Sequence, residues 1–237
     1  MKIKNKIEYI IENNLLEEQK AFVNSNKKEN VFLSGLGCGK STALYVKLIK
    51  KIVDNFNFLS KDSYIVSVYK NNDDLINLIT IPNIKELLEL LNIKYELVKS
   101  EKIFIIKDFN TIINLRTLEN INEDLFSFSN NLFIDYIDCL SIEEAELKYN
   151  KLLSLIVLNN LYQKERTVSL VSSIGSVGNK ESNFLYNKFE LNKDNKDLFL
   201  IKMKSYDNIH LHESFFNDIK KHYNKEQSSV YLDCEFI

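Results

Sequence analysis

Three of the chain's five glycines fall within one short window, "VFLSGLGCGKST" at residues 31–42. Gly35, Gly37 and Gly39 are separated by single residues, and Lys40 and Ser41 follow directly. An apolar run precedes the glycines, and behind them apolar residues recur every four positions between lysines. The window therefore predicts a strand, a glycine-rich loop and a helix in that order.

The glycine window matches the phosphate-loop pattern G-x-x-x-x-G-K-[ST], with Ser34 in the place of the first glycine. In such a loop, backbone N–H groups and a helix N-terminus hold phosphate oxygens, the lysine reaches the β- and γ-phosphates, and the hydroxyl binds Mg2+. We therefore expect Ser41 to be a metal ligand. The residues expected to contact the nucleotide are Gly35, Gly37, Cys38, Gly39, Lys40, Ser41 and Thr42. The alternative is a glycine turn beside an accidental lysine.

The rest of the chain alternates predicted strands and helices. Apolar runs predict strands at "NVFLS", "SYIVSVY", "NLFIDYID" and "TVSLVSSIGSVG", and "KIFIIKD" with "TIINLRTL" predicts a hairpin. Helical spacing is found at residues 5–24, 141–162 and 214–223. One further helix is predicted from about Asp73, and another, "NIKELLELL", behind the only proline, Pro82. This alternation predicts an α/β fold with a mostly parallel sheet covered by helices on both faces.

Length and composition are those of a globular protein. With 237 residues, 45% of them hydrophobic, and no linker-like stretch, we expect a single domain over residues 1–237, with 205–237 as a closing helix and terminal segment. The net charge of −2 means that any DNA contact has to come from a local patch such as "MKIKNK".

Cysteine and histidine usage gives no metal or disulfide pattern. The three cysteines are widely spaced and form no CxxC or Cys/His ligand motif; they are Cys38, Cys139 and Cys234. The three histidines are expected to be solvent-exposed residues of the tail; they are His210, His212 and His222. No apolar run approaches the ~20 residues that cross a bilayer, and the charged start differs from a signal peptide. We therefore expect a cytoplasmic protein without membrane contact.

An acid at the end of a neighbouring strand has to complete a magnesium site beside a phosphate loop. "LFID" supplies Asp135 in that setting, although a strand-end acid can also cap the following helix. A base that orients the attacking water is harder to find, because Tyr136 follows the acid and the next candidates are Asp138 and Glu143. Asp138 is the candidate base, and its alternative is an ordinary surface carboxylate.

Two further side-chain types are candidates for nucleotide contact. The amide of Gln19, just before the loop, can both donate to and accept from an adenine edge, although most glutamines are merely solvated. Arg116 and Arg166 are the only arginines, so a transition-state cation is one of these two or a lysine. Arg166 is the candidate, and the alternative is a surface role for both.

In their order, these motifs resemble the N-terminal ATPase domain of the tailed-phage terminase large subunit. The similarity covers "LLEEQKAF", "SGLGCGKST", the hairpin, "NLFIDYID", "TVSLVSSIGSVGNKESNFLYNKF" and the closing "YDNIHLHESFFNDIKKHYNKEQSSVYLDCEFI". The resemblance implies a RecA-like P-loop NTPase fold, adenine contact by Gln19, and sensing of the γ-phosphate by Ser172 and Ser173. It further implies ATP and Mg2+ as cofactors and double-stranded DNA as the translocated substrate.

The same resemblance implies a homo-oligomeric ring, a portal protein and a small terminase subunit as partners, in the cytoplasm of a bacterial host carrying the phage or prophage. The chain departs from the family at three positions: Leu36 replaces a loop arginine, Tyr136 the catalytic glutamate, and Ile174 a frequent proline. The sequence stops where the family's nuclease domain begins, so no nuclease activity is expected in this chain.

Two other functions fit the same motifs. Losing a positioned base costs ~10² to 10⁴ in rate and losing an arginine finger ~10³ to 10⁵, while neither removes the phosphate cradle. The first alternative is therefore a degenerate ATP-binding module that serves assembly or regulation without hydrolysis. The second is another helicase-like P-loop ATPase, which the lack of helicase motifs after Gly178 disfavours.

Overall fold

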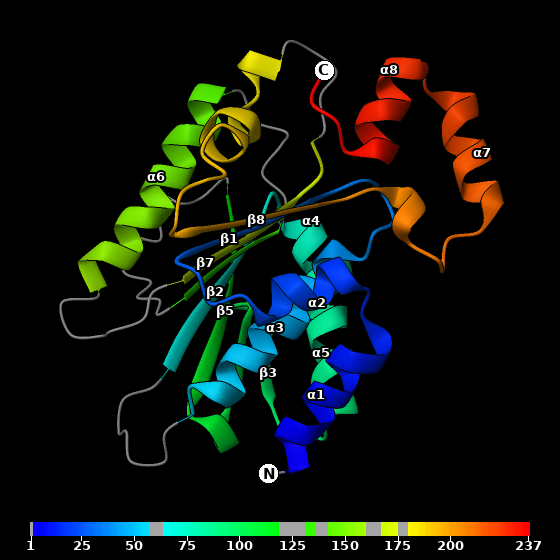
Figure 1. Cartoon of the computed structure of the whole chain (residues 1–237). Helices are drawn as coiled ribbons and strands as arrows, with labels where there is room; N and C mark the ends of the chain where they lie inside the picture. Colours follow the sequence, from blue (N-terminus) through cyan, green and yellow to red (C-terminus); the bar gives the residue numbers. More distant parts are fainter. Residues whose placement is uncertain (1, 57–63, 119–130, 136–141, 160–166, 175–179) are drawn as a thin grey trace.

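The fold is built on one eight-stranded sheet, seen in Figure 1, in a computed structural model that describes residues 2–56, 64–118, 131–135, 142–159, 167–174 and 180–237. The strand order is β3-β4-β5-β2-β6-β7-β1-β8. The strands are β1 (Glu29–Ser34), β2 (Tyr64–Lys70), β3 (Glu96–Val98), β4 (Ile103–Ile106), β5 (Thr111–Thr117), β6 (Asn131–Asp135), β7 (Thr167–Ser172) and β8 (Leu198–Met203).

Most of the sheet is parallel. The six strands from β5 to β8 along this order run in one direction. At one side of the sheet, β4 is antiparallel to β5 and β3 is antiparallel to β4. The hairpin predicted from "KIFIIKD" and "TIINLRTL" is confirmed as β4 and β5. Because β1, β2, β6 and β7 are parallel, their last residues meet at one edge of the sheet, where open α/β sheets bind ligands.

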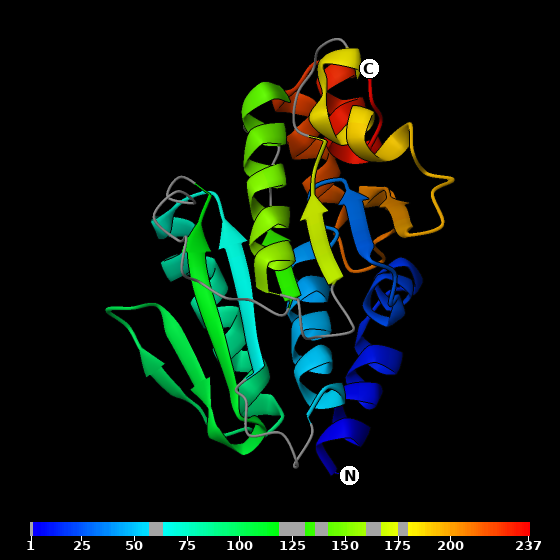
Figure 2. The same ribbon diagram turned by 90° about the vertical axis from the view of Figure 1, so that its left-hand side faces the viewer.

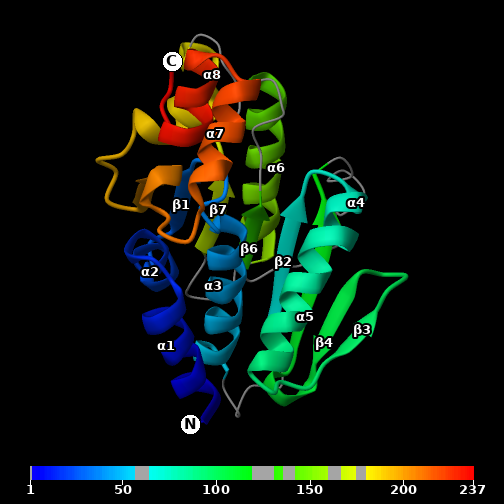
Figure 3. The same cartoon turned by 90° about the vertical axis from the view of Figure 1, so that its right-hand side faces the viewer.

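Helices cover both faces of this sheet. Alternate side chains of β1 point to opposite sides, so Phe32 joins one apolar cluster while Val31 and Leu33 join the other. The first cluster packs under α1 (Lys2–Asn14), α2 (Glu17–Asn24), α3 (Lys40–Asp54) and α5 (Ile81–Leu90), the face seen in Figure 3. The second packs under α6 (Ile142–Asn159), which lies in front of the sheet in Figure 2. The predicted layers are thus confirmed.

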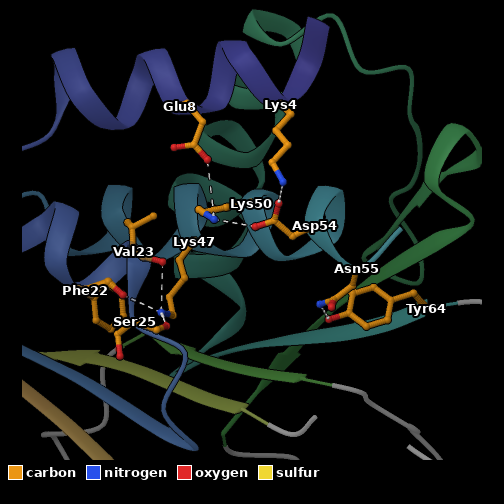
Figure 4. A network of polar contacts seen from close by, with 10 residues as sticks. All are labelled: Lys4, Glu8, Phe22, Val23, Ser25, Lys47, Lys50, Asp54, Asn55 and Tyr64. Carbon is orange, nitrogen blue, oxygen red and sulfur yellow. Dashed lines mark hydrogen bonds and ion pairs between the residues drawn. The ribbon is translucent and has the colours of Figure 1, made fainter. Parts of the chain in front are cut away.

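The central helix α3 is fastened to the N-terminal helices by polar contacts. Lys47, only 1% exposed, donates from Nζ to the carbonyl oxygens of Phe22 at 2.6 Å and Ser25 at 2.5 Å, which satisfies acceptors at the end of α2 (Figure 4). Asp54 at the other end of α3 pairs with Lys4 of α1 at 3.0 Å. These contacts fix α1 and α2 against α3, whose start carries the glycine window.

The helix predicted behind Pro82 is present as α5, but no break separates it from the helix that begins at Asp73. The chain stays helical from α4 (Asp73–Leu75) through a π-turn at Ile76–Thr80 into α5, with Pro82 in the first turn of α5. The wider π-turn is an insertion that helices use where the regular hydrogen-bond pattern is interrupted. Proline lacks the N–H that an interior position needs, so the π-turn and Pro82 occur together.

Two strands were not predicted at all. β3 is short and half exposed, and β8 forms the edge beside β1, pairing with it from Glu29↔Leu198 to Ser34↔Met203. The chain then enters the closing segment, which contains a 3-10 turn (Ser205–Asp207), α7 (Glu213–His222), α8 (Lys225–Ser228) and a π-turn (Ser229–Asp233). In the parts of the chain that the structure describes, no helix combines the length and apolar character needed to span a membrane.

Candidate functional site

The candidate site is built around the glycine loop, defined here as Ser34–Ser41, between the end of β1 and the start of α3. Gly37 and Gly39 have φ angles of 75° and 64°, a conformation that side-chain-bearing residues rarely adopt. Gly39 is the residue before the first turn of α3. The first N–H groups of a helix have no intrahelical acceptor and face outward as an anion site. The loop therefore has the geometry of an anion cradle.

Lys40, Ser41 and Asp135 converge at this edge. Lys40 Nζ donates to the carbonyl oxygen of Gly35 at 3.2 Å, so its ammonium lies back over the loop. Ser41 Oγ donates to Asp135 Oδ1 at 3.0 Å, although 94 residues separate the two in sequence. A hydroxyl and a carboxylate oxygen at this separation are ligands suited to Mg2+, which otherwise keeps its waters. The two residues fit the magnesium site that the sequence predicts.

Asp135 is more tightly held than the sequence suggested. It ends β6 at 1% exposure, and its Oδ2 accepts from Tyr45 Oη at 2.7 Å and from Lys70 Nζ at 2.6 Å. Burial and the negative charge of Asp135 raise the pKa of Tyr45, so the phenol stays protonated as a donor. The phenol oxygen also lies 3.1 Å from Thr80 Oγ1, in the π-turn. The carboxylate is thus held by two neutral hydroxyls and one cation.

Gln19 lies against the glycine loop, where the adenine-contact prediction requires it to be. Its Nε2 donates to the carbonyl oxygen of Cys38 at 2.7 Å, and its Oε1 accepts from the N–H of Leu16 at 2.8 Å. A Cβ on Gly39 would lie 2.7 Å from the Gln19 Nε2 atom, so the amide also explains that glycine. Here the amide positions the loop, and adenine contact stays a prediction.

The loop thiol is buried and weakly acidic. Burial raises the pKa of Cys38, and its Sγ lies 3.8 Å from the carbonyl oxygen of Met203 in β8. A protonated, enclosed thiol packs as a small apolar group and is a poor nucleophile. The nucleotide contact predicted at this position therefore concerns its backbone.

The closing segment holds the other side of the glycine loop. Leu36 is bonded twice: its N–H donates to the carbonyl oxygen of Tyr231 at 2.8 Å, and its carbonyl accepts from Ser205 Oγ at 2.7 Å. Asn208 Nδ2 donates to the carbonyl oxygen of Gly37 at 2.8 Å. The loop conformation is therefore fixed by residues 169 or more positions later in the chain as well as by its own glycines.

The remaining predicted residues divide into four groups. Ser172 and Ser173 are buried at the end of β7, where Ser172 is paired with Leu33 of β1, so they lie on the same sheet edge as the loop. Arg116 lies on β5, and its guanidinium donates to the carbonyl oxygen of Glu101 at 3.0 Å. Tyr136, Asp138 and Arg166 lie outside the described residues. The exposed histidines, as expected, are His210, His212 and His222.

Two residues of the site were missed by the sequence analysis, Lys70 and Tyr45. Lys70 is the last residue of β2 and stands opposite Asp135 in the strand register. A charged residue that ends an apolar strand just before "NNDD" was the available signal. Tyr45 lies on the buried face of α3 among aliphatic residues, so its pattern is that of an ordinary core position.

Comparison with known proteins rests on structure alone, because no known family and no curated protein matches the sequence. The large terminase of a thermophilic bacteriophage superimposes with a TM-score of 0.75 at 12% identity, over 94% of this chain and 54% of that one. The large terminase ATPase domain of Thermus phage P74-26 gives 0.71 at 11% identity, over 100% of both chains.

The first of these terminases in complex with ADP is similar too, with a TM-score of 0.71 at 13% identity, over 93% of this chain and 53% of that one. This chain thus spans about half the length of the thermophilic phage protein. The resemblance predicted from the motifs is confirmed at the level of the fold: this is the RecA-like fold of the large terminase ATPase domain.

Proposed function

We propose, from the premise that this chain has the fold of a phage large terminase ATPase domain, that it binds ATP with Mg2+ and couples ATP hydrolysis to double-stranded DNA packaging into a procapsid. In this proposal Ser172 and Ser173 sense the γ-phosphate. The residues that hold the nucleotide are Gln19, Gly35, Gly37, Cys38, Gly39, Lys40, Ser41 and Thr42. Ser41 and Asp135 hold the metal.

One observation carries the proposal: Ser41 Oγ lies 3.0 Å from Asp135 Oδ1 at the mouth of a glycine loop. The sequence pattern alone can occur by chance in a glycine turn. Such a turn would not be expected to place its serine against a buried carboxylate at the end of a non-adjacent strand. That pairing is what a magnesium site beside a phosphate loop requires.

The chain's own residues suggest how phosphate enters. Lys40 Nζ contacts the Gly35 carbonyl at 3.2 Å, a neutral acceptor that a phosphate oxygen replaces with a charged one. The N–H groups at the start of α3, which have no acceptor within the helix, can then donate to the phosphate with little rearrangement of the loop. Gln19 and the closing segment already fix the loop conformation. When bound, Mg2+ supplies charge neutralisation between the β- and γ-phosphates.

The partners in this proposal follow from the family of the fold. They are double-stranded DNA, a portal protein, a small terminase subunit and further copies of this chain in a ring, in the cytoplasm of the host bacterium. The net charge of −2 places the DNA contact on a local patch and not on the surface as a whole.

A second candidate is the ATP-binding module without hydrolysis. One observation favours it: Leu36 stands where the family carries an arginine, and both its N–H and its carbonyl are bonded to the closing segment. Such a loop binds phosphate through Lys40 and its backbone but brings no arginine to the transition state. The other alternative, a helicase-like P-loop ATPase, is supported by none of the comparisons given above.

Lys40→Ala tests the proposal. Removing a charge-assisted contact worth ~1.5–3 kcal/mol should weaken ATP binding by about 10- to 150-fold, measured by calorimetric titration with Mg2+. Lys50→Ala is the matched control, because Lys50 lies on the same helix and pairs with Asp54 at 2.6 Å. Unchanged ATP affinity in Lys40→Ala would overturn the proposal.

Turnover separates the two candidates. Steady-state ATP hydrolysis by the purified chain, measured with and without double-stranded DNA, should be lost in Lys40→Ala. ATP binding with no turnover in any of these conditions would favour the module without hydrolysis.

A further inference from the structure

The ion pair of Lys70 with Asp135 is the most buried one among the described residues. Their side chains are 6% and 2% exposed, and Lys70 Nζ lies 2.6 Å from Asp135 Oδ2. The two residues end neighbouring parallel strands and face each other in register. The pair is therefore a buried contact between the carboxyl ends of two neighbouring strands and not a surface ion pair.

The charge of this cluster is balanced without any ligand. Asp135 has one negative charge, and Ser41 and Tyr45 add only neutral hydroxyls. Among the residues that the structure describes, Lys70 is the one cation in contact with the carboxylate. A divalent cation arriving at the Ser41–Asp135 pair therefore meets a carboxylate whose charge is already compensated. Two cations on one buried carboxylate repel each other strongly where water screens little.

The phosphates of the nucleotide remove this conflict. They bring several negative charges to the glycine loop. The Asp135 carboxylate contacts Lys70 through Oδ2 and Ser41, in the first turn of α3, through Oδ1, so only this carboxylate group lies between the Lys70 ammonium and Ser41. Lysine is a flexible point charge with three donors, so its head group can change partner while its stem stays packed.

We propose that Lys70 serves as the internal cation of this site. Its ammonium neutralises Asp135 in the free protein and moves to contact the γ-phosphate when Mg2+ and ATP bind. This rests on the proposed nucleotide function. Lys70 then supplies, from the end of β2, the positive charge that Leu36 cannot supply from the loop. It discriminates ATP from ADP, because only ATP presents a γ-phosphate.

Lys70→Gln is the direct test. The amide keeps a donor for Asp135 Oδ2 but removes the charge. Titration calorimetry with ATP and with ADP, each with Mg2+, should show the preference for ATP reduced about tenfold or more, with ADP affinity changed less than twofold. Lys28→Gln is the matched control: Lys28 pairs with Asp197 at 2.8 Å just before β1, at the opposite end of that strand from the glycine loop.

Lys70→Gln can fail to fold, because an unpaired buried carboxylate is destabilising. A second pair of variants tests the proposal in that case. Asp135→Asn removes that charge, so Asp135→Asn and Asp135→Asn with Lys70→Gln can be compared without a lone buried anion. Asp135→Asn alone should weaken the binding of both nucleotides, because it removes a proposed metal ligand. The double variant should have a ratio of ATP to ADP affinity about tenfold or more below that of Asp135→Asn alone. Thermal unfolding of each variant shows whether it is folded.

The outcomes separate the two proposals. If Lys40→Ala loses nucleotide affinity while Lys70→Gln keeps the wild-type preference for ATP, or the double variant keeps the preference of Asp135→Asn, the role of Lys70 is overturned and the proposed function stands. If the wild-type chain binds neither ATP nor ADP, the proposed function itself fails.

Discussion

Gly35 lies where several groups of the closing segment converge on the glycine loop. A Cβ at this position would collide with Ser205 Oγ and would lie 2.8 Å from the carbonyl oxygens of Tyr231 and Leu232. Backbone carbonyls cannot rotate away as a flexible side chain can, so the glycine is required by close approach and not by its own φ angle. The first residue of "GLG" is thus a packing residue, whereas Gly37 and Gly39 are conformational ones.

Gly35→Ala should therefore be destabilising. Inserting a methyl group into this contact should lower the free energy of unfolding by about 1–3 kcal/mol, measured by urea denaturation. Adding Ser205→Ala removes the nearest side-chain atom and should restore part of the loss. An unchanged denaturation midpoint in Gly35→Ala would mean that the closing segment does not lie against the loop.

The sequence predicted those site residues that form one continuous motif. Gly35 to Thr42 are adjacent in the chain, so spacing alone identified them, and Asp135 was recognisable as an acid that ends an apolar run. Lys70 and Tyr45 contact Asp135 only because the sheet order places β2 beside β6 and α3 above it. No periodicity in a single sequence contains that order, so these two residues required the structure.

At the scale of elements, α3 connects the glycine loop to the N-terminal helices. Its Lys47 is buried under α2, and burial together with the neighbouring charges of Lys51 and Lys50 lowers the pKa of Lys47 to about 7 (Figure 4). Because the ordinary lysine pKa is near 10.4, the unfolded chain binds an extra proton between these two values. The stability contribution of Lys47 consequently rises with pH over this window and is constant below it.

Lys47→Met makes this pH dependence measurable. The free energy of unfolding of the wild type minus that of Lys47→Met should increase from pH 7 to pH 10, with a slope of up to about 1.4 kcal/mol per pH unit. Chemical denaturation at several pH values gives this difference, and other titrating groups cancel in it. A difference that falls with pH, or does not change, would contradict the assignment.

Element types followed from the sequence where the pattern was strong. The run "NVFLS" and the four-residue spacing behind it predicted β1 and α3, and the helix begins at Lys40. Pro82 misled because its lack of an N–H suggests a helix boundary, whereas a π-turn accommodates it. β8 was overlooked although its first four residues, Leu198 to Ile201, form an apolar run; Lys202 interrupts this run, and the strand is only partly buried at the sheet edge.

At the scale of the whole molecule, ligand binding should be visible as stabilisation. If the site binds ATP with Mg2+, a free concentration 100 times the Kd adds about 2.7 kcal/mol to the folded state. For a chain of this size that corresponds to a rise in Tm of about 5–10 °C, measured by scanning calorimetry. With its affinity lowered about 10- to 150-fold, Lys40→Ala should gain only about 0.3–1.4 kcal/mol at the same concentration, and its rise in Tm should be correspondingly smaller. An equal rise in Lys40→Ala would place the bound nucleotide elsewhere.

The contacts between the closing segment and the glycine loop also set an order of events during synthesis. Ser205 and Asn208 bond to loop residues 169 and 171 positions earlier. A nascent chain can form β1 and α3 long before these residues leave the ribosome, but its glycine loop then lacks those two hydrogen bonds. The loop acquires its final shape only after the closing segment has emerged, so an incomplete chain on the ribosome carries the motif without a finished site.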